Sequence, residues 1–503
     1  MKHLGTLLIK LASKRRLPAT ILSCAIPLHM GAPGHALPET NRDTSQGQIL
    51  GGAVSASNSD GDKLSLDLFL QLVEKNYPKL KGADAERRIA GAKRLEKAGA
   101  FDPVITSINE YLRVQDIFKP GVAKDAIHNE SRLDLLTRSG IKLFATARLN
   151  PNDTKTPYVP TGRAGEYAAG MTVPLLRGLR VNEKKAAEDQ AKLGEPVAAQ
   201  VYGLSRLEIL LKAAALYWEW VGAKVRIGVA RNLLAVSQVR LDQIKERVQK
   251  GDLPALDIAE QEQEIQRRQA AVVKHTREFQ KASISASVLL WDDSGTPKPM
   301  PDLADVPDLK PEPRKFTDSE WLEGRKSALA LRPELKRISL EREQARIDLR
   351  LAQNMILPAV DAYVLQGADT GYQGIGPVVR AGMAMSLPLR QRTARGQAQA
   401  AQLKIQKLNL DEKAEKQRIQ AEVDDAVSAI NTSYEKWEAT VLEVKKARQV
   451  ESGERMRFGA GDGTLFLVNQ RERATAEAEM RLAEVHVEYL QSMAAFRAVT
   501  GRL

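Results

Sequence analysis

The side chains best suited to chemistry in this sequence lie in two glycine-centred stretches. One reads Arg247-Val248-Gln249-Lys250-Gly251-Asp252-Leu253, and the other reads Arg457-Phe458-Gly459-Ala460-Gly461-Asp462-Gly463. Each follows a long helical pattern, where glycine supplies the left-handed geometry that ends a helix. Each arginine could form an ion pair, because acids such as Asp252, Asp257 or Asp462 lie close to it in the sequence pattern. The alternative is that these are ordinary helix-end charges, worth ~0.3–1 kcal/mol each.

The sequence shows no catalytic or metal-binding pattern. Three of its six histidines fall within the first 36 residues, and His128, His275 and His486 have no second histidine at ligand spacing. Walker-type and dinucleotide-binding glycine loops are absent, since the glycine-dense residues 459–463 follow a helix rather than a strand. We therefore expect a protein that is not an enzyme and that has no cofactor and no metal.

Long helices position the two turns. A helix over residues 181–249 is predicted by apolar residues at alternating spacings of four and three, and it would be roughly 100 Å long. A return helix over 254–291 has an apolar residue at every seventh position, which predicts left-handed supercoiling. Pro196 predicts a kink or short unwound step near Gly194, because proline inside a helix costs ~3 kcal/mol. The apolar positions are Leu207, Leu211, Ala214, Trp218, Val221 and Val225, then Ile258, Ile265, Val272, Phe279 and Ala286.

The pattern recurs in the second half of the chain. Five landmarks reappear in order: Pro78 and Pro103 as Pro333 and Pro358, Pro174 as Pro388, Gly251-Asp252 as Gly461-Asp462, and the return-helix heptad as Val468, Thr475, Leu482, Tyr489 and Phe496. The predicted repeats, 64–291 and 321–503, are joined by a proline-rich linker at 292–320. The second repeat would contain a long helix at 390–457 and a return helix at 464–500. The two shorter helices of each repeat together match its long helix in length, so they could lie alongside it.

Each repeat also contains two predicted strands, about 104–118 and 166–176 in the first and 359–367 and 378–388 in the second. Residues 141–149 could add another strand to the otherwise polar insertion 119–160. Two strands carry apolar residues on one face and small or polar residues on the other, which is typical of membrane β-strands and also of half-buried soluble strands. The candidate lipid-facing residues are Tyr167, Ala169, Met171 and Val173, and Val379, Ala381, Met383, Met385 and Leu387. Four strands cannot close a barrel, but three copies would supply twelve.

The N-terminus has the features of a secretory signal peptide over residues 1–36, with basic residues, an apolar run and a small-residue end at Ala36. A flexible leader, 37–63, follows. Cys24, the only cysteine, could instead be a lipidation site. Removing residues 1–36 lowers the net charge from +12 to +7, and the remaining charges are interspersed along helices, so nucleic-acid binding is not expected.

Taken together, these features resemble the TolC-type outer-membrane efflux protein family. The resemblance rests on the two-fold repeat, the heptads after the Gly251 and Gly461 turns, and the strand exits Met171-Thr172-Val173-Pro174-Leu175 and Met385-Ser386-Leu387-Pro388-Leu389. It implies a mainly α fold with a small β part. Three protomers would form a twelve-stranded barrel in the outer membrane of a Gram-negative bacterium, continued by a coiled-coil helical tunnel across the periplasm.

The resemblance also implies partners and a site. The partners would be two further protomers, outer-membrane lipid, a periplasmic adaptor, and an inner-membrane pump or ABC exporter. The insertion 119–160 would lie on the outer face of the cell, and the linker 292–320 around the waist of the tunnel. The tip residues would dock the adaptor and gate the duct: Arg247, Gly251, Asp252, Asp257, Glu260, Arg457, Gly461 and Asp462. The second half has Phe466 and Asn469 where family members often carry acids, so Asp257 and Glu260 would have to supply any acidic ring. A soluble periplasmic coiled-coil adaptor or scaffold is the alternative function.

Overall fold

The computed structural model describes residues 63–115, 119, 121–150, 161–370 and 374–503, all within one unit, Asp60–Leu503. The signal peptide, the possible lipidation site Cys24 and the leader as far as residue 62 lie outside the described residues. The first half contains helices α1 (Leu66–Asn76) and α2 (Pro78–Ala98), strands β1 (Val104–Gln115), β2 (Ala123–Leu136), β3 (Lys142–Leu149) and β4 (Glu166–Pro174), and helices α3 (Glu183–Gln249) and α4 (Leu256–Ser287). The second half contains α5 (Asp318–Leu331), α6 (Pro333–Ile356), β5 (Ala359–Asp369), β6 (Gly376–Ser386), α7 (Arg392–Gly459) and α8 (Leu465–Val499).

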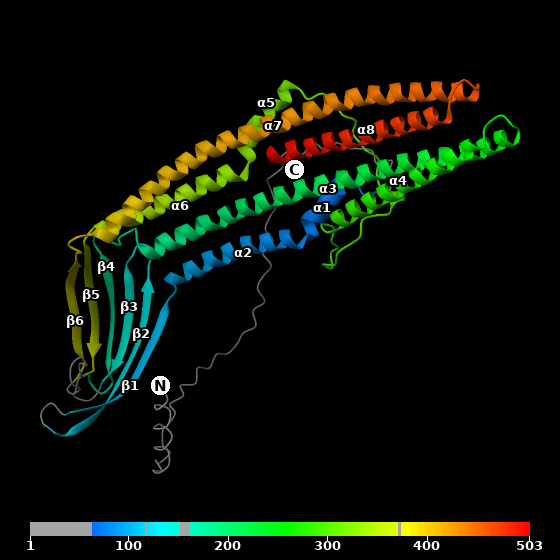
Figure 1. Ribbon diagram of the computed structural model, residues 1–503. Helices are drawn as coiled ribbons and strands as arrows, with labels where there is room; N and C mark the ends of the chain where they lie inside the picture. The colour runs from blue at the N-terminus through cyan, green and yellow to red at the C-terminus, as the bar shows by residue number, and fades with distance from the viewer. Residues whose placement is uncertain (1–62, 116–118, 120, 151–160, 371–373) are drawn as a thin grey trace, which may run out of the picture. The chain divides into compact units, whose positions relative to one another are not determined.

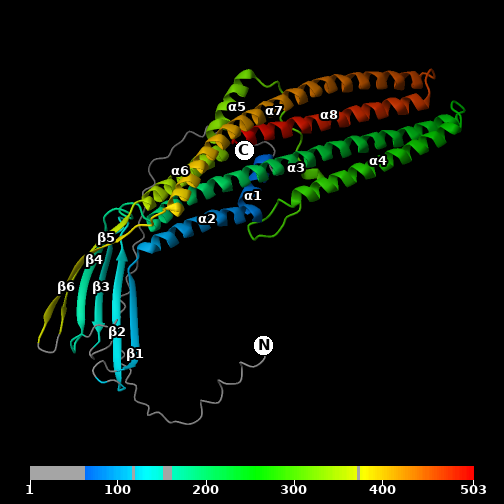
Figure 2. The ribbon, with the colours of Figure 1, turned by 60° about the vertical axis from the view of Figure 1, so that its left-hand side comes forward.

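Two helices of 67 and 68 residues, α3 and α7, form the frame of the molecule (Figures 1 and 2). Local signals set their ends. The Asn182 side chain accepts a hydrogen bond from the Lys185 backbone N–H at 2.9 Å and so begins α3, as expected of an N-cap. Each long helix packs against its return helix in one half, and α2 or α6 packs along the other half. None of the helices in the described part of the chain has the length and apolar content needed to cross a bilayer.

α3 continues through Pro196 as regular helix, so the predicted unwound step near Gly194 is not present. The helices α2 and α6 pack against α3, and Arg94 of α2 pairs with Glu195 at 3.1 Å. Packing along the neighbouring helices offsets the ~3 kcal/mol that a proline costs inside a helix. Tertiary contacts therefore outweigh the local preference here.

The linker 292–320 is part of the packed core rather than a loose connection. Met300, Val306 and Phe316 are buried with α1, α3 and α8, and Lys224 of α3 donates a hydrogen bond to the Val306 carbonyl oxygen at 2.7 Å. α5 begins inside the predicted linker, at Asp318, because Thr317 and Glu320 form a capping box. The largest buried side chains of this core are Trp220, Tyr217 and Phe69.

The described strands form one antiparallel sheet in the order β1-β2-β3-β4-β5-β6. The sequence predicted four strands per chain and left 141–149 open as a further one, but the described part of the structure has six, so the prediction of four was wrong. β2 and β3 lie within residues 119–160 and separate β1 from β4. The expected barrel of twelve strands, which assumed four per protomer, does not follow from a six-stranded sheet. Residues 119–160 look polar in the sequence because charged residues occupy alternate positions of β2.

Candidate functional site

The two helix turns have the same backbone geometry. Gly251 and Gly461 have φ values of +83° and +85°, in the left-handed region that favours glycine. In the first turn the Asp252 N–H donates to the Arg247 carbonyl oxygen at 2.9 Å, and in the second the Asp462 N–H donates to the Arg457 carbonyl oxygen at the same distance. These bonds satisfy carbonyls at the end of a helix, as in the Schellman motif. The sequence prediction of two tight turns is confirmed.

The predicted gate residues occupy these turns but make different contacts. Arg457 forms one expected ion pair, with Nε 3.5 Å from Asp462 Oδ2, although both side chains are more than half exposed. The Arg247 guanidinium instead lies 5.5 Å from the centre of the Phe458 ring, which belongs to the other hairpin. A cation and an aromatic face attract each other at this distance. The two turns are therefore neighbours, and at the Arg247 side an aromatic contact links them.

Asp252 is exposed, whereas Asp257, in the first turn of α4, and Glu260, three residues later, are half-buried. Burial raises the pKa of Glu260, and the nearby charges of Asp257 and Glu264 add to the effect. In the described part of the chain, no group of three or more histidine, cysteine or acidic residues could coordinate a metal ion. The structure places Asp257 and Glu260 three residues apart near the start of α4.

A larger set of polar side chains lies further from the turns, between the two hairpins. We call it the polar layer. Its centre is Glu472 of α8, whose side chain is completely buried. Three arginines from three different helices donate to the Glu472 carboxylate: Arg240 of α3, Arg268 of α4 and Arg455 of α7. The full layer comprises Ser237, Arg240, Gln261, Glu264, Arg268, Arg455, Asn469 and Glu472.

Arg268 connects the two hairpins most directly. It is 2% exposed, and it donates from Nη2 to Asn469 Oδ1 at 3.2 Å and to Glu472 Oε2 at 3.0 Å. On its own helix it donates from Nε to Glu264 Oε1 at 3.0 Å. Asn469 also donates from Nδ2 to Gln261 Oε1 at 3.2 Å. The tip half of α4 therefore reaches α8 through charged and amide groups.

Burial alone would favour the neutral form of Glu472. The hydrogen bond and charge of Arg240, the charge of Arg268 and the hydrogen bond of Arg455 outweigh that effect and lower the pKa of Glu472 to about 2. Glu472 is ionised at neutral pH and is surrounded by donors. A buried carboxylate in this environment is costly to leave without its partners.

Sequence reasoning missed the polar layer, although a signal was present. The predicted heptad of the return helix follows Ile258, Ile265 and Val272, but the buried positions from 258 to 275 are Glu264 and the three residues Gln261, Arg268 and His275. Those three residues also recur every seven positions, so they lie on the same seam. His275 and His486, which have no second histidine at ligand spacing in the sequence, are also part of the helix packing. Both are about nine-tenths buried, with His275 beside Glu278 at 2.9 Å and His486 Nε2 2.8 Å from the Pro311 carbonyl oxygen.

The second predicted site lies on the sheet. In antiparallel strands, directly opposite residues share a face, and the strand register pairs Ala145 with Ala169, Met171 with Val364, and Ala362 with Met383. The predicted lipid-facing residues of β4 and β6 therefore share one face, except Leu387, which lies past the end of β6. We call this face the apolar face. Its apolar residues include Ile105, Leu133, Leu135, Leu143, Ala145, Ala147, Tyr167, Ala169, Met171, Val173, Val360, Ala362, Val364, Val379, Ala381, Met383 and Met385, and its uncharged polar residues are Ser107, Asn109, Gln115, Asn129, Ser131 and Gln366.

The opposite face, which we call the charged face, carries most of the charged residues of the sheet. Arg148 and Glu166 pair across it at 2.8 Å, with side chains 15% and 12% exposed. By contrast, Val379, Met383 and Met385 on the apolar face are each more than 60% exposed. The Arg148–Glu166 pair is thus sheltered on one side of the sheet, and large apolar groups are presented on the other. The charged residues of this face are Glu110, Lys124, Glu130, Arg132, Asp134, Lys142, Arg148, Glu166, Asp361, Asp369 and Arg380.

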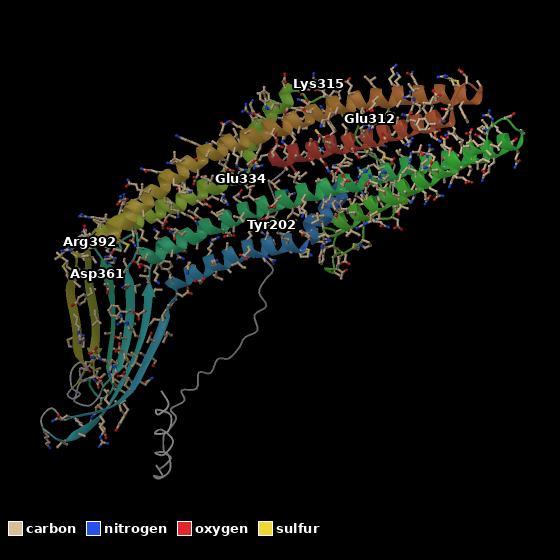
Figure 3. All side chains as sticks on the ribbon, viewed as in Figure 1. Tyr202, Glu312, Lys315, Glu334, Asp361 and Arg392 are labelled. Atoms are coloured by element: carbon tan, nitrogen blue, oxygen red, sulfur yellow. The ribbon has the colours of Figure 1, made fainter. Side chains whose placement is uncertain are left out.

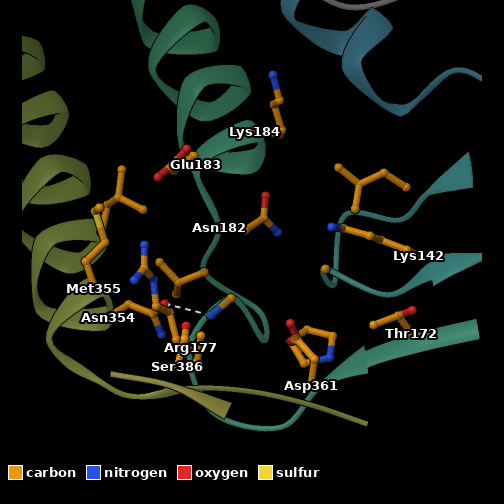
Figure 4. Close-up of a pocket in the computed structure, with 17 residues that line it drawn as sticks. Lys142, Thr172, Arg177, Asn182, Glu183, Lys184, Asn354, Met355, Asp361 and Ser386 are labelled. Carbon is orange, nitrogen blue, oxygen red and sulfur yellow. Dashed lines mark hydrogen bonds between the residues drawn. The ribbon is translucent and has the colours of Figure 1, made fainter. Parts of the chain in front are cut away.

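A cavity of about 460 Å³ lies where the sheet meets the helices. Figure 4 shows Lys142 and Asp361 of the charged face around it, together with Asn182 and Glu183 at the start of α3. The Gly178 N–H donates to Asn354 Oδ1 at 2.9 Å and ties the connection from β4 to the end of α6. Figure 3 shows Asp361 and Arg392 at this same junction. The charged face therefore continues into the region where the helices begin.

Residues 325–502 match the family described as outer membrane efflux protein. No curated protein sequence matches the chain significantly. Solved structures of outer-membrane channels share its fold. CmeC of Campylobacter jejuni is 12% identical with a TM-score of 0.61, over 93% of this chain and 94% of that chain. MtrE of Neisseria gonorrhoeae, in its open state, is 14% identical with a TM-score of 0.62, over 88% and 89%. VceC of Vibrio cholerae is 14% identical with a TM-score of 0.61, over 87% and 96%.

The family and these channels are outer-membrane proteins of Gram-negative bacteria with a periplasmic extension, which confirms the predicted location. The same family match and solved channel structures support an efflux role. They do not favour the alternative of a soluble adaptor or scaffold. The predicted resemblance is likewise confirmed: residues 325–502 match the outer membrane efflux protein family, and the described fold as a whole is similar to that of TolC-like channels.

Proposed function

We propose that this protein is the outer-membrane exit duct of a tripartite efflux system or type I secretion system. It would work as a homotrimer with a periplasmic adaptor and an inner-membrane pump or ABC exporter. The observation that carries the proposal is a six-stranded sheet with an exposed apolar face, joined to two helical hairpins whose turns lie far from it. The sheet suits contact with lipid, and the hairpins suit a periplasmic extension.

Transport through such a duct is passive. The chain presents no nucleotide-binding loop in its sequence, so the partner transporter supplies the energy. The protein itself is proposed to be a channel and not an enzyme. Its two halves act as duplicated units, each with strands at one end and a docking turn at the other. Substrate choice then belongs to the transporter, and the duct supplies an exit path.

Gating is proposed at the tip, with the polar layer as the element that keeps the two hairpins together. Glu472 joins α3, α4 and α7 to α8 through three arginines, so separating the hairpins must expose or unpair a buried carboxylate. The exposed Arg457–Asp462 pair lies within one turn and contributes little to such closure. Adaptor docking at Gly251, Asp252, Gly461 and Asp462 would shift the balance between closed and open tips.

Two measurements test the duct itself. The full-length protein should fractionate with outer membranes, and the purified protein should conduct ions in planar lipid bilayers. Conductance should be small while the tips are closed. A protein recovered in the soluble periplasmic fraction, with no conductance, would contradict the proposal.

A matched pair of variants tests the gate. Glu472→Gln removes the charge that the three arginines share, and we expect it to raise the mean single-channel conductance several-fold. Glu488→Gln on the same helix removes one carboxylate of an exposed pair with Lys436, both 49% exposed, and should leave conductance unchanged. Equal conductance in the two variants would show that the polar layer does not gate the channel.

A further inference from the structure

We propose that the β2–β3 hairpin is part of the membrane-spanning wall, so that each copy contributes six strands and three copies close a barrel of eighteen. The inference rests on the trimeric channel proposed above. It departs from the twelve strands that the family resemblance implies. The partner for each free sheet edge is a second copy of this chain.

The distribution of charge along the hairpin is the first argument. Between Asn129 and Leu136 in β2, and throughout β3, all five charged residues lie on the charged face: Glu130, Arg132, Asp134, Lys142 and Arg148. The alternate positions Leu133, Leu135, Leu143 and Ala145 join the apolar face. Alternation of apolar and charged positions is what a strand between lipid and an aqueous lumen requires. A hairpin projecting into water would need no such separation.

The same separation holds across the sheet. Among the strand residues that the structure describes, the charged residues on the apolar face are Arg113 and Asp125. They are direct cross-strand partners, with Arg113 Nε 3.7 Å from Asp125 Oδ1. Both lie beyond Asn129, where β2 extends past its pairing with β3. This position suits the aqueous side of the membrane boundary.

The position of the hairpin within the sheet is the second argument. β2 pairs with β1 from Val104 to Gln115, and β3 pairs with β4 from Lys142 to Arg148. The hairpin is therefore inserted in the middle of the sheet and is not attached to an edge. Moving it out of the wall would break both sets of pairings, and each broken backbone hydrogen bond is costly in lipid.

The free edges are the third argument. β1 and β6 end the described sheet, and the exposed side chains there include Ile105, Tyr111, Val379 and Met383. Each neighbouring pair of strands is antiparallel, so β1 and the sixth strand run in opposite directions. β6 of one copy can then pair antiparallel with β1 of the next, and closure around the trimer leaves no edge in lipid.

Strand number sets the width of the barrel. With strands about 4.8 Å apart and tilted by about 40°, eighteen strands give a diameter of roughly 36 Å, against roughly 24 Å for twelve. Barrels of this size enclose an aqueous channel rather than a packed core. Glu130, Arg148 and Glu166 are direct cross-strand neighbours on the charged face and would line that channel.

Electron cryo-microscopy of the full-length protein in lipid nanodiscs tests the inference directly. We expect a three-fold particle with eighteen strands in the membrane. A conducting three-fold particle with twelve strands, and the β2–β3 hairpin outside the wall, would overturn the inference and leave the proposed function standing. A particle with no three-fold axis and no conductance would overturn the proposed function itself.

Paired cysteines in a Cys24→Ser background give an independent test in outer-membrane vesicles treated with a short bis-maleimide. Ala145→Cys with Ala169→Cys joins β3 to β4 and should cross-link within one chain. Ser107→Cys with Ala169→Cys places the cysteines on β1 and β4. These strands would be neighbours only if the β2–β3 hairpin lay outside the sheet. In the eighteen-stranded barrel this pair should therefore not cross-link within a chain. Ser107→Cys with Ala381→Cys joins β1 of one copy to β6 of the next and should give dimers and trimers on denaturing gels. A β1–β4 cross-link without a β3–β4 cross-link would overturn the eighteen-stranded barrel.

Discussion

The two return helices are equivalent in the order of elements, yet they are packed differently. α8 lies between α7 and α3 and is buried on two sides (Figures 1 and 2). Its approach to α3 is so close that a Cβ atom at Gly222 would clash with Val487. α4 packs mainly along α3, and Leu256, Val273 and Ile284 remain more than 60% exposed. Over its tip half, the buried residues of α4 are Gln261, Glu264, Arg268 and His275.

This difference indicates which hairpin depends on charge. Apolar packing on two sides stabilises α8, and such packing changes little with pH or salt. The tip half of α4 is tied to α8 by the polar layer, whose strength depends on ionisation and on every partner being present. We therefore expect the α3–α4 hairpin to be the one that separates when the layer is disturbed.

The largest effect is expected from Glu472→Gln. Three arginines would lose a shared buried carboxylate, and loss of one partner of a buried ionic contact costs about 3 kcal/mol or more. Hydrogen exchange should become faster in peptides from the tip half of α4 and change less in the middle of α8. Glu488→Gln, at the exposed pair with Lys436, is the control. Equal acceleration in both return helices would contradict the proposed asymmetry.

Acid should produce a similar but gradual effect. The pKa of Glu472 is lowered from 4.5 to about 2, so its stabilising contribution is fully present above about pH 4.5 and is lost as the pH falls through about 2. Hydrogen exchange of the α4 tip, measured at several pH values after correction for the intrinsic exchange rate, should rise over that interval. The Glu472→Gln variant should lack this rise. A rise of the same size in the variant would assign the pH dependence to other groups.

Arg268→Met should weaken the contact by less, about 2 kcal/mol, because Glu472 keeps Arg240 and Arg455 as partners. The variant isolates the α4 contribution to the layer. Arg277→Met, at an exposed position of the same helix outside the polar layer, is the matched control. Chemical denaturation followed by a probe on α4 should distinguish the two variants. Equal midpoints would show that Arg268 does not anchor α4.

The smallest effect is expected from Gly461→Ala. An alanine Cβ would meet open space, but φ of +85° costs a non-glycine residue about 1 kcal/mol. Gly251→Ala should cost about the same, because the two turns share their geometry. Gly453→Ala, inside α7 and also facing open space, should instead stabilise slightly. A lower melting temperature for the two turn variants than for Gly453→Ala is the expected result.

The sequence predicted the parts of this molecule that local rules determine. Heptads located both helical hairpins, and glycines after long helical runs located both turns. Pro78 and Pro333 begin α2 and α6, as proline at the first helical position does. Alternation at Tyr167, Ala169 and Met171 identified a face of β4 that the register confirms as continuous with β3 and β5.

The features that the sequence did not predict are mostly those in which charged or polar residues lie within a strand or a buried helix interface. β2 was not recognised because Glu130, Arg132 and Asp134 make it look like a surface loop, although they alternate as a strand requires. The polar layer was missed because Gln261 and Arg268 look solvent-exposed until α8 supplies Asn469 and Glu472. Pro196 was given too much weight because the neighbouring helices that offset its cost come from distant segments. In each case the deciding partner lies far away along the chain.

The pairing of β4 with β5 has a consequence for how the protein is made. Glu166 lies opposite Asp369, and Pro174 lies opposite Asp361, so this one ladder joins segments about 190 to 200 residues apart. During export from the N-terminus, β1 to β4 emerge long before β5 exists to cover the open side of β4. Segments whose partners are distant in the chain assemble slowly, and uncovered strand edges invite wrong pairing. The nascent chain should therefore need a periplasmic chaperone until residue 386 has crossed the inner membrane.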